Sequence, residues 1–356
     1  MRKRTTIPLL IAVLLFAALG TMLYLRAKAP PEAARLLPES DAILYVQLEA
    51  IRSATHFDQT PVVRSPYFQH FIDATGIVPE RDIDAVAFAL HRMPNPNGPN
   101  GPVAYSEVFI GHFDGDKLDR YLASIATSKE TYTGRTIYTI PVGEPPARQL
   151  RVALLAYDTI AASNMPTPEQ IHSMLDRSRA SALSTPGSSL LAARFRQVPL
   201  LSQAWGIGHI GLPFSDNGFI SVLGLQLPLP EDTDLVASLR YTGTAHVLSG
   251  GAVHLRIEEF APNPTAAEHT VDTLATVLGI LRGLSADQAS AQQSPNPAAE
   301  AMHSVLNSIT LSHSDSRAFL NATASLDEIK ALASAHDPTA EAPPPPASPA
   351  PPPTSK

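Results

Sequence analysis

The chain has 356 residues, no cysteine, 26 lysines and arginines and 33 aspartates and glutamates, which gives a formal net charge of −7. Without cysteine it can form neither disulfides nor thiolate metal sites. Five of the basic residues precede Pro30, so the rest of the chain carries about −12. This acidic balance argues against nucleic acid or anionic lipid as the partner of that part.

Residues 5–25, TTIPLLIAVLLFAALGTMLYL, are uncharged and follow the basic start MRKR. At about 1.5 Å per residue, a helix of this length reaches roughly 31 Å and crosses a hydrocarbon core of about 30 Å. We therefore expect residues 1–29 to hold a basic N-terminus and a transmembrane anchor, with the lipid bilayer as partner of the span. The alternative is a cleaved signal peptide, but its apolar region is shorter, and the nearby AKA sequence at 27–29 is followed by proline.

The basic residues before the span slightly outweigh those just after it, which favours an N-terminus in the cytoplasm. The two groups are Arg2, Lys3 and Arg4 with the amino terminus, and Arg26, Lys28 and Arg35. The expected location is a bacterial inner membrane, crossed once, with residues 26–356 extracytoplasmic. The absence of cysteine fits a bacterial envelope protein better than a secreted eukaryotic one.

Two stretches are expected to lie outside the folded part. Residues 30–38 form a short tether between the membrane and the domain. Residues 337–356 contain nine prolines and no large apolar side chain, so they cannot bury enough surface to fold and are expected to be extended and disordered. The simplest interpretation is an inert tail; a ligand for a proline-binding module or a spacer into the cell wall are the alternatives.

Between tether and tail, one pattern of strands and helices occurs twice, in residues 39–180 and 187–336. The sequence DIDAVAFAL at 82–90 and DTDLVASLR at 232–240 share four identities at a constant offset of 150. A Pro-Glu pair precedes each copy, and both indicate a turn that leads into a β-strand. The sequence therefore predicts two related halves that arose by duplication.

The predicted elements follow in chain order. In the first half they are a strand at 42–48, a helix from 66 to 75, strands at 82–90 and 104–113, a helix from 114, strands at 136–141, 150–156 and 159–163, and a helix opened by a capping box at 167–170. In the second half they are strands at 204–210, 232–240 and 251–260, a helix at 264–284, strands at 308–313 and 317–323, and a helix opened by a capping box at 325–328. The helix at 264–284 is expected to bury Val271, Leu274, Leu278 and Leu281.

This order predicts an α+β fold with mostly antiparallel sheets that are covered by helices. The sequence LPESDAILYV at 37–46, just after a single anchor helix, resembles the start of the ectodomain in membrane-anchored bacterial proteins of unknown function. The FDGDKLDRY sequence at 113–121 is similar to those proteins as well. The resemblance implies a membrane-anchored ectodomain and brings no catalytic residue with it.

Two short motifs are better explained by structure than by ligands. GIGHIG at 206–211 matches the dinucleotide fingerprint, but a turn sequence follows it where a helix is required, so it indicates a glycine-rich strand end. Asp114 and Asp116 could suggest calcium, but an EF-hand loop would need glycine at Asp119 and glutamate at Ile125. These acids suit the first turn of a helix. We expect no cofactor and no metal.

His254, Arg256 and Glu258 form the strongest polar cluster, because side chains on a strand alternate and these three share one face. A histidine beside a carboxylate can act as acid or base near neutral pH, so they are the candidate catalytic residues. A solvated sheet face with cross-strand ion pairs explains them equally well.

The function that these observations favour is a non-enzymatic, membrane-anchored binding or scaffold protein of the bacterial envelope, with another envelope protein as partner and no nucleic acid. The alternative is a hydrolase or transferase that acts on envelope material in a cleft between the two halves. Perturbed histidine or carboxylate groups in such a cleft would favour the enzyme. A flat surface without them would favour the binding protein.

Overall fold

The computed structural model describes residues 29–59, 62–98, 100–143, 148–180, 187–209, 219–222, 225–228, 233–243, 251–291 and 296–335. The predicted membrane span at 5–25 and the proline-rich tail at 337–356 lie outside these residues. Within the described ranges, no helix is both long enough and apolar enough to cross a bilayer.

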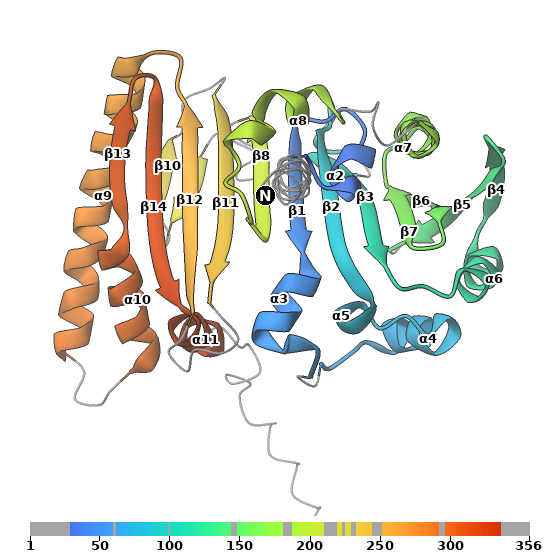
Figure 1. Ribbon diagram of the computed structural model, residues 1–356, viewed down its shortest axis with the longest axis horizontal. Helices are drawn as coiled ribbons and strands as arrows, with labels where there is room; N and C mark the ends of the chain where they lie inside the picture. The colour runs from blue at the N-terminus through green and yellow to red at the C-terminus, as the bar shows by residue number, and fades with distance from the viewer. Residues whose placement is uncertain are drawn as a thin grey trace, which may run out of the picture.

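Twelve strands form one antiparallel sheet, and two others pair as a separate hairpin (Figure 1). The order across the sheet is β13 (Thr310–Ser314), β14 (Arg317–Ser325), β12 (Ala252–Phe260), β11 (Asp234–Thr242), β8 (Ala204–His209), β1 (Ala42–Gln47), β2 (Ile83–Arg92), β3 (Val103–Gly111), β7 (Thr159–Ser163), β6 (Arg148–Ala156), β5 (Arg135–Val142) and β4 (Ser128–Tyr132). The hairpin pairs β9 (Phe219–Val222) with β10 (Leu225–Pro228). The predicted α+β, antiparallel class is confirmed, but the main strands form one sheet instead of separate ones.

The sheet is continuous because the opening strands of the two predicted halves pair with each other. β1 and β8 run antiparallel, with Ala42 opposite Gly208 and Val46 opposite Ala204. From this central pair, β2 and β3 follow on one side and β11 and β12 on the other. The pairing removes two strand edges that would otherwise be exposed. The duplication of 39–180 and 187–336 stays a prediction.

The helices in chain order are α2 (Glu32–Leu36), α3 (Leu48–Thr55), α4 (Pro66–Thr75), α5 (Pro79–Asp82), α6 (Gly115–Ile125), α7 (Glu169–Arg179), α8 (Ser189–Arg194), α9 (Pro264–Ala291), α10 (Pro297–Ser308) and α11 (Leu326–Ala335), with short 3-10 helices η1 (Phe57–Gln59) and η2 (Phe195–Gln197). Two predicted helix starts are confirmed. The Ser65 hydroxyl accepts a hydrogen bond from the amide of Phe68 at the start of α4, and the Asp114 carboxylate accepts one from the amide of Lys117 at the start of α6. α4 ends, as expected, at Gly76 in the left-handed conformation.

Of the two predicted capping boxes, only the second forms. The Ser325 amide donates to the Glu328 carboxylate at 2.6 Å, and the Glu328 amide donates to the Ser325 hydroxyl at 3.2 Å. The box at 167–170 is wrong, because Pro168 occupies the cap position of α7 and provides no side-chain acceptor. Glu169 instead accepts a hydrogen bond from Thr167, which lowers the pKa of Glu169.

The main core lies on one face of the central strands. α2, α7 and α8 cover this face, and Figure 1 shows α2 and α8 lying across β8, β1 and β2. Met174 of α7, Leu191 of α8, Ile43 of β1 and Ile207 of β8 are all fully buried in this core. One core therefore spans the junction between the two predicted halves.

A second core lies on the opposite face of β5, β6 and β7. Leu118 and Leu122 of α6 pack against Tyr138 and Val152, and Phe71 of α4 packs beside them. Because strand side chains alternate, β6 and β7 supply apolar residues to both cores. Both faces of this half of the sheet are thus covered by helices.

In the other half, α9 and α10 pack on one face only. Leu278 and Leu281 of α9 are buried with Leu306 of α10 and with Leu311 of β13. The two α9 positions belong to the predicted buried stripe, although α9 continues to Ala291, beyond its predicted end. On β11, β12 and β14, every second side chain points to the opposite face of the sheet. Among the described residues on that face of these three strands, only Val236 and Phe260 belong to the main core that the helices cover.

Gly111 is required where β3 passes the start of β2. A Cβ atom at Gly111 would overlap the carbonyl oxygen of Asp82, close to the β-bulge between Ile83 and Ala85. We expect Gly111→Ala to lower the free energy of unfolding by at least about 1–3 kcal/mol, because the backbone must move. Gly279→Ala in α9 is the control: its Cβ meets open space, so it should be neutral or stabilise by up to about 1 kcal/mol. Equal urea midpoints for the two variants would contradict this.

Candidate functional site

The three predicted site residues lie on one face of β12, as their spacing requires. His254 is held between two hydroxyls: its Nε2 lies 2.8 Å from Thr242 Oγ1, and its Nδ1 lies 3.2 Å from Thr323 Oγ1. Four residues along a strand separate His254 from Glu258 by roughly 13 Å. The histidine and the carboxylate therefore do not form an acid–base pair.

Glu258 is almost fully buried and is held by two arginines. Its carboxylate accepts hydrogen bonds from Arg256 and from Arg317, each at 3.2 Å. The side chain of Glu258 is 3% exposed, whereas both arginines are nearly half exposed. A buried carboxylate needs such partners, so Glu258 is explained as the anchor that positions two guanidinium groups.

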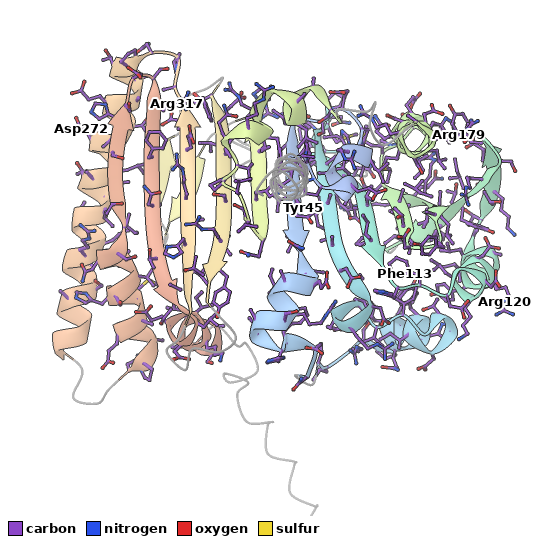
Figure 2. All side chains as sticks on the ribbon, in the orientation of Figure 1. Tyr45, Phe113, Arg120, Arg179, Asp272 and Arg317 are labelled. Atoms are coloured by element: carbon purple, nitrogen blue, oxygen red, sulfur yellow. The ribbon has the colours of Figure 1, made fainter. Side chains whose placement is uncertain are left out.

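Aromatic rings support these cations. The Arg256 guanidinium lies 5.0 Å from the ring centre of Phe319, and Phe260 lies between Arg317 at 5.4 Å and Arg194 at 4.2 Å. Figure 2 labels Arg317 near the start of β14. Cation–π contacts fix the planes of the guanidinium groups while leaving their edges free to donate.

We call the polar side of β11, β12 and β14 the polar face; it is defined by the buried Ser238 and by Arg240, His254, Arg256, Arg317, Asn321 and Thr323. A hollow of about 240 Å³ lies on it, and every residue of this set except Arg317 lines the hollow. The sequence indicated only the β12 members. The partners from β11 and β14 became visible through strand register, which places Arg240 opposite His254 and Asn321 opposite Arg256.

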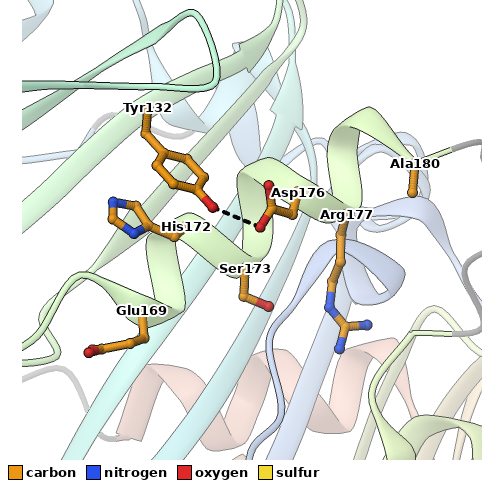
Figure 3. Close-up of a pocket in the computed structure, with 7 residues that line it drawn as sticks. All are labelled: Tyr132, Glu169, His172, Ser173, Asp176, Arg177 and Ala180. Carbon is orange, nitrogen blue, oxygen red and sulfur yellow. Dashed lines mark hydrogen bonds between the residues drawn. The ribbon is translucent and has the colours of Figure 1, made fainter.

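A second hollow, of about 520 Å³, lies between β4 and α7 (Figure 3). The Tyr132 hydroxyl donates to Asp176 at 3.0 Å, and Figure 3 shows Arg177 directed away from that pair. The Tyr132 ring stacks on His172 with the ring centres 3.8 Å apart, and His172 Nε2 lies 2.8 Å from Glu130. No sequence pattern pointed to this site, because β4 itself was not predicted.

These contacts in the second hollow explain its residues as a structural clasp. The hydrogen bond to Asp176 is the main cause that raises the pKa of Tyr132, so the hydroxyl stays protonated near neutral pH and supplies no phenolate as a base. The His172 ring is engaged on its face by Tyr132 and at its edge by Glu130. Together they hold the exposed edge hairpin of β4 and β5 against α7.

A buried polar chain crosses β2, β3 and β7 on the face of the main core. His91 Nε2 lies 3.0 Å from Ser106 Oγ, which lies 3.0 Å from Ser163 Oγ. The spacing resembles a nucleophile and its base, but all three residues are at most 6% exposed. Burial lowers the pKa of His91 to about 4. A neutral imidazole without access to substrate is a structural group here.

The two discarded motifs are placed as ordinary secondary structure. Gly206 and Gly208 lie inside β8, which ends at His209, and the last two motif positions, 210 and 211, lie outside the described residues. Asp114 is the N-cap of α6. In the described part of the chain, no group of three or more histidine, aspartate or glutamate side chains is placed to hold a metal ion.

The fold described above is that of an α+β protein built on one twelve-stranded antiparallel sheet. The structure of this chain is similar to that of TP0453 of Treponema pallidum in two crystal forms, with TM-scores of 0.41 and 0.44 and sequence identities of 13% and 12%. The matches cover 86% of this chain in both cases, and 98% and 99% of the other chain. No protein-family model and no curated protein matches the sequence.

Proposed function

We propose that this protein is a non-enzymatic binding or scaffold protein of the bacterial envelope, anchored by residues 5–25 in the inner membrane. Residues 26–356 lie outside the cytoplasm, and another envelope protein is the partner. The basic start, the uncharged span and the acidic remainder of the chain support this placement.

The observation that carries the proposal is the polar face. Its charged groups are arranged for recognition: Glu258 is buried between Arg256 and Arg317, and His254 contacts two threonine hydroxyls. General acid–base chemistry would need a histidine or carboxylate in reach of a second reacting group. An open sheet face with fixed cations and amides instead suits a complementary polar surface.

Site-specific photo-cross-linking in cells tests the binding role. A photoreactive residue replaces Ser312, an exposed position on β13 beside the polar face, and the control replaces Tyr157, which is 84% exposed in the other half. We expect a discrete protein adduct from position 312 and none from 157. No adduct at 312 or at its neighbour Thr310, or equal adducts at 157, would contradict the proposal.

Protease treatment of spheroplasts tests the placement in the membrane. A tag after residue 356 should be digested from outside, while a tag at the N-terminus should be protected. N-terminal sequencing of the mature protein should find the basic residues that precede the span. A soluble mature chain that begins near Pro30 would overturn the anchored arrangement.

A further inference from the structure

We infer that the hollow on the polar face binds one oxyanion group, a phosphate or a carboxylate, presented by a soluble ligand. The inference rests on the proposed recognition role of the same face and specifies its chemistry. Four features of the hollow support it: the donors on its lining, one arginine without a partner among the described residues, the local positive charge and its small volume.

Strand register places the lining side chains in two parallel rows on one face. Arg240, His254 and Thr323 stand side by side on β11, β12 and β14, and Ser238, Arg256 and Asn321 form the next row. Neighbouring strands lie about 4.8 Å apart, and the rows are about 7 Å apart along the strands. Arg240, Arg256 and Asn321 therefore bring donors to one hollow. His254 and Thr323 contact each other, and the Ser238 hydroxyl donates to the carbonyl of Arg256.

Arg240 is the uncommitted cation of this site. Its side chain is exposed and lines the hollow, and among the described residues no hydrogen bond or ion pair engages its guanidinium. One terminal nitrogen of Arg256 donates to Glu258, which leaves the other N–H groups of this guanidinium to donate to a ligand. Guanidinium groups bind phosphate and carboxylate in a bidentate manner, which makes two of them beside one hollow a receptor for such groups.

The local charge is positive although the chain as a whole carries −7. The site has three cations, Arg240, Arg256 and Arg317, and one carboxylate, Glu258. That carboxylate is already paired with Arg256 and Arg317. The next carboxylate, Asp234, is paired with Arg194 and His209. A cationic site on an acidic body attracts a small anion while the body repels an extended anionic surface, and this favours a soluble ligand over a membrane.

The size of the hollow limits what can occupy it. At about 240 Å³ it lies below the usual range of roughly 300–1,000 Å³ for sites that enclose a drug-sized molecule. It suits one charged group, either free or at the tip of a larger ligand. The remainder of such a ligand would lie over the exposed strands.

Calorimetric titration of the full-length, detergent-solubilised protein tests this inference. The probes are inorganic phosphate, acetate and the phosphodiester fragment glycerophosphoglycerol, at constant ionic strength. Trp205 gives a second readout, because this sole tryptophan stands directly opposite Ser238 on the neighbouring strand. We expect phosphate or acetate to bind with a change in tryptophan emission.

Arg240→Gln should weaken that binding about tenfold or more, because a charge-assisted contact is lost. Arg135→Gln is the matched control: it removes one exposed arginine at the far edge of the sheet and should leave binding unchanged. Equal affinities for the two variants, or binding of the phosphodiester alone, would overturn the inference. If phosphate and acetate fail to bind while position 312 still cross-links, the inference is lost and the binding role stands.

Discussion

Replacement of Trp205 by alanine is expected to lower the free energy of unfolding by about 3–5 kcal/mol. Trp205 lies on β8, is 4% exposed, and stacks on Tyr45 of β1 with ring centres 5.4 Å apart. Phe195 packs edge-on against it at 5.3 Å. The loss is large because the indole fills the core where the two predicted halves join, so a cavity there weakens both.

Urea unfolding followed by circular dichroism measures this change. Tyr157→Ala provides the control, because its side chain is 84% exposed and should change stability by less than about 0.5 kcal/mol. Trp205→Phe should fall between the two, since it keeps an aromatic ring against Tyr45. If Trp205→Ala unfolded at the same urea concentration as Tyr157→Ala, the two halves would not depend on a shared core.

The parts of the fold that could be predicted from the sequence are those decided by local chemistry. Ser65 and Asp114 cap helices because their side chains satisfy free backbone amides within the same turn. The largely apolar segment at 104–113 predicted a strand, and β3 forms there at Val103–Gly111. The short edge strand β4 lacked this signal, because four of its five residues are exposed and polar.

Long-range pairing could not be predicted in this way. The pairing of β1 with β8 joins residues more than 150 positions apart. No local sequence pattern indicates which two strand edges will pair. For that reason a single sheet replaced the expected separate ones.

In the candidate site, too, the local arrangement could be predicted and the long-range contacts could not. Alternation on one strand predicted that His254, Arg256 and Glu258 share a face. The sequence did not show that Arg317 would hold Glu258 or that Arg240 would stand beside His254, since these depend on the register with β14 and β11. A signal was present in the polar alternation of 317–323, which matches that of 254–258.

Glu107→Gln is expected to stabilise the protein in a pH-dependent way. Glu107 lies on β3 between Phe88 of β2 and Ala162 of β7, and burial raises its pKa to about 7. Below about pH 4.5 the carboxyl is protonated in both the folded and the unfolded state and has no effect. As the pH rises to 7, the unfolded state releases its proton first, so the folded state loses stability. Above pH 7 the loss reaches about 3 kcal/mol.

The difference in unfolding free energy between Glu107→Gln and the unmodified protein should therefore be near zero at pH 4.5. It should rise to about 3 kcal/mol at pH 8. The difference is the quantity to measure, because His91, with its pKa lowered to about 4 by burial, acts in the opposite direction: it costs stability as the pH falls from about 6.5 to 4. That contribution cancels between the two proteins. Glu268→Gln, at an exposed position on α9, removes the same charge and should give a flat difference. A flat profile for Glu107→Gln as well would mean that its carboxylate is solvated in the folded state.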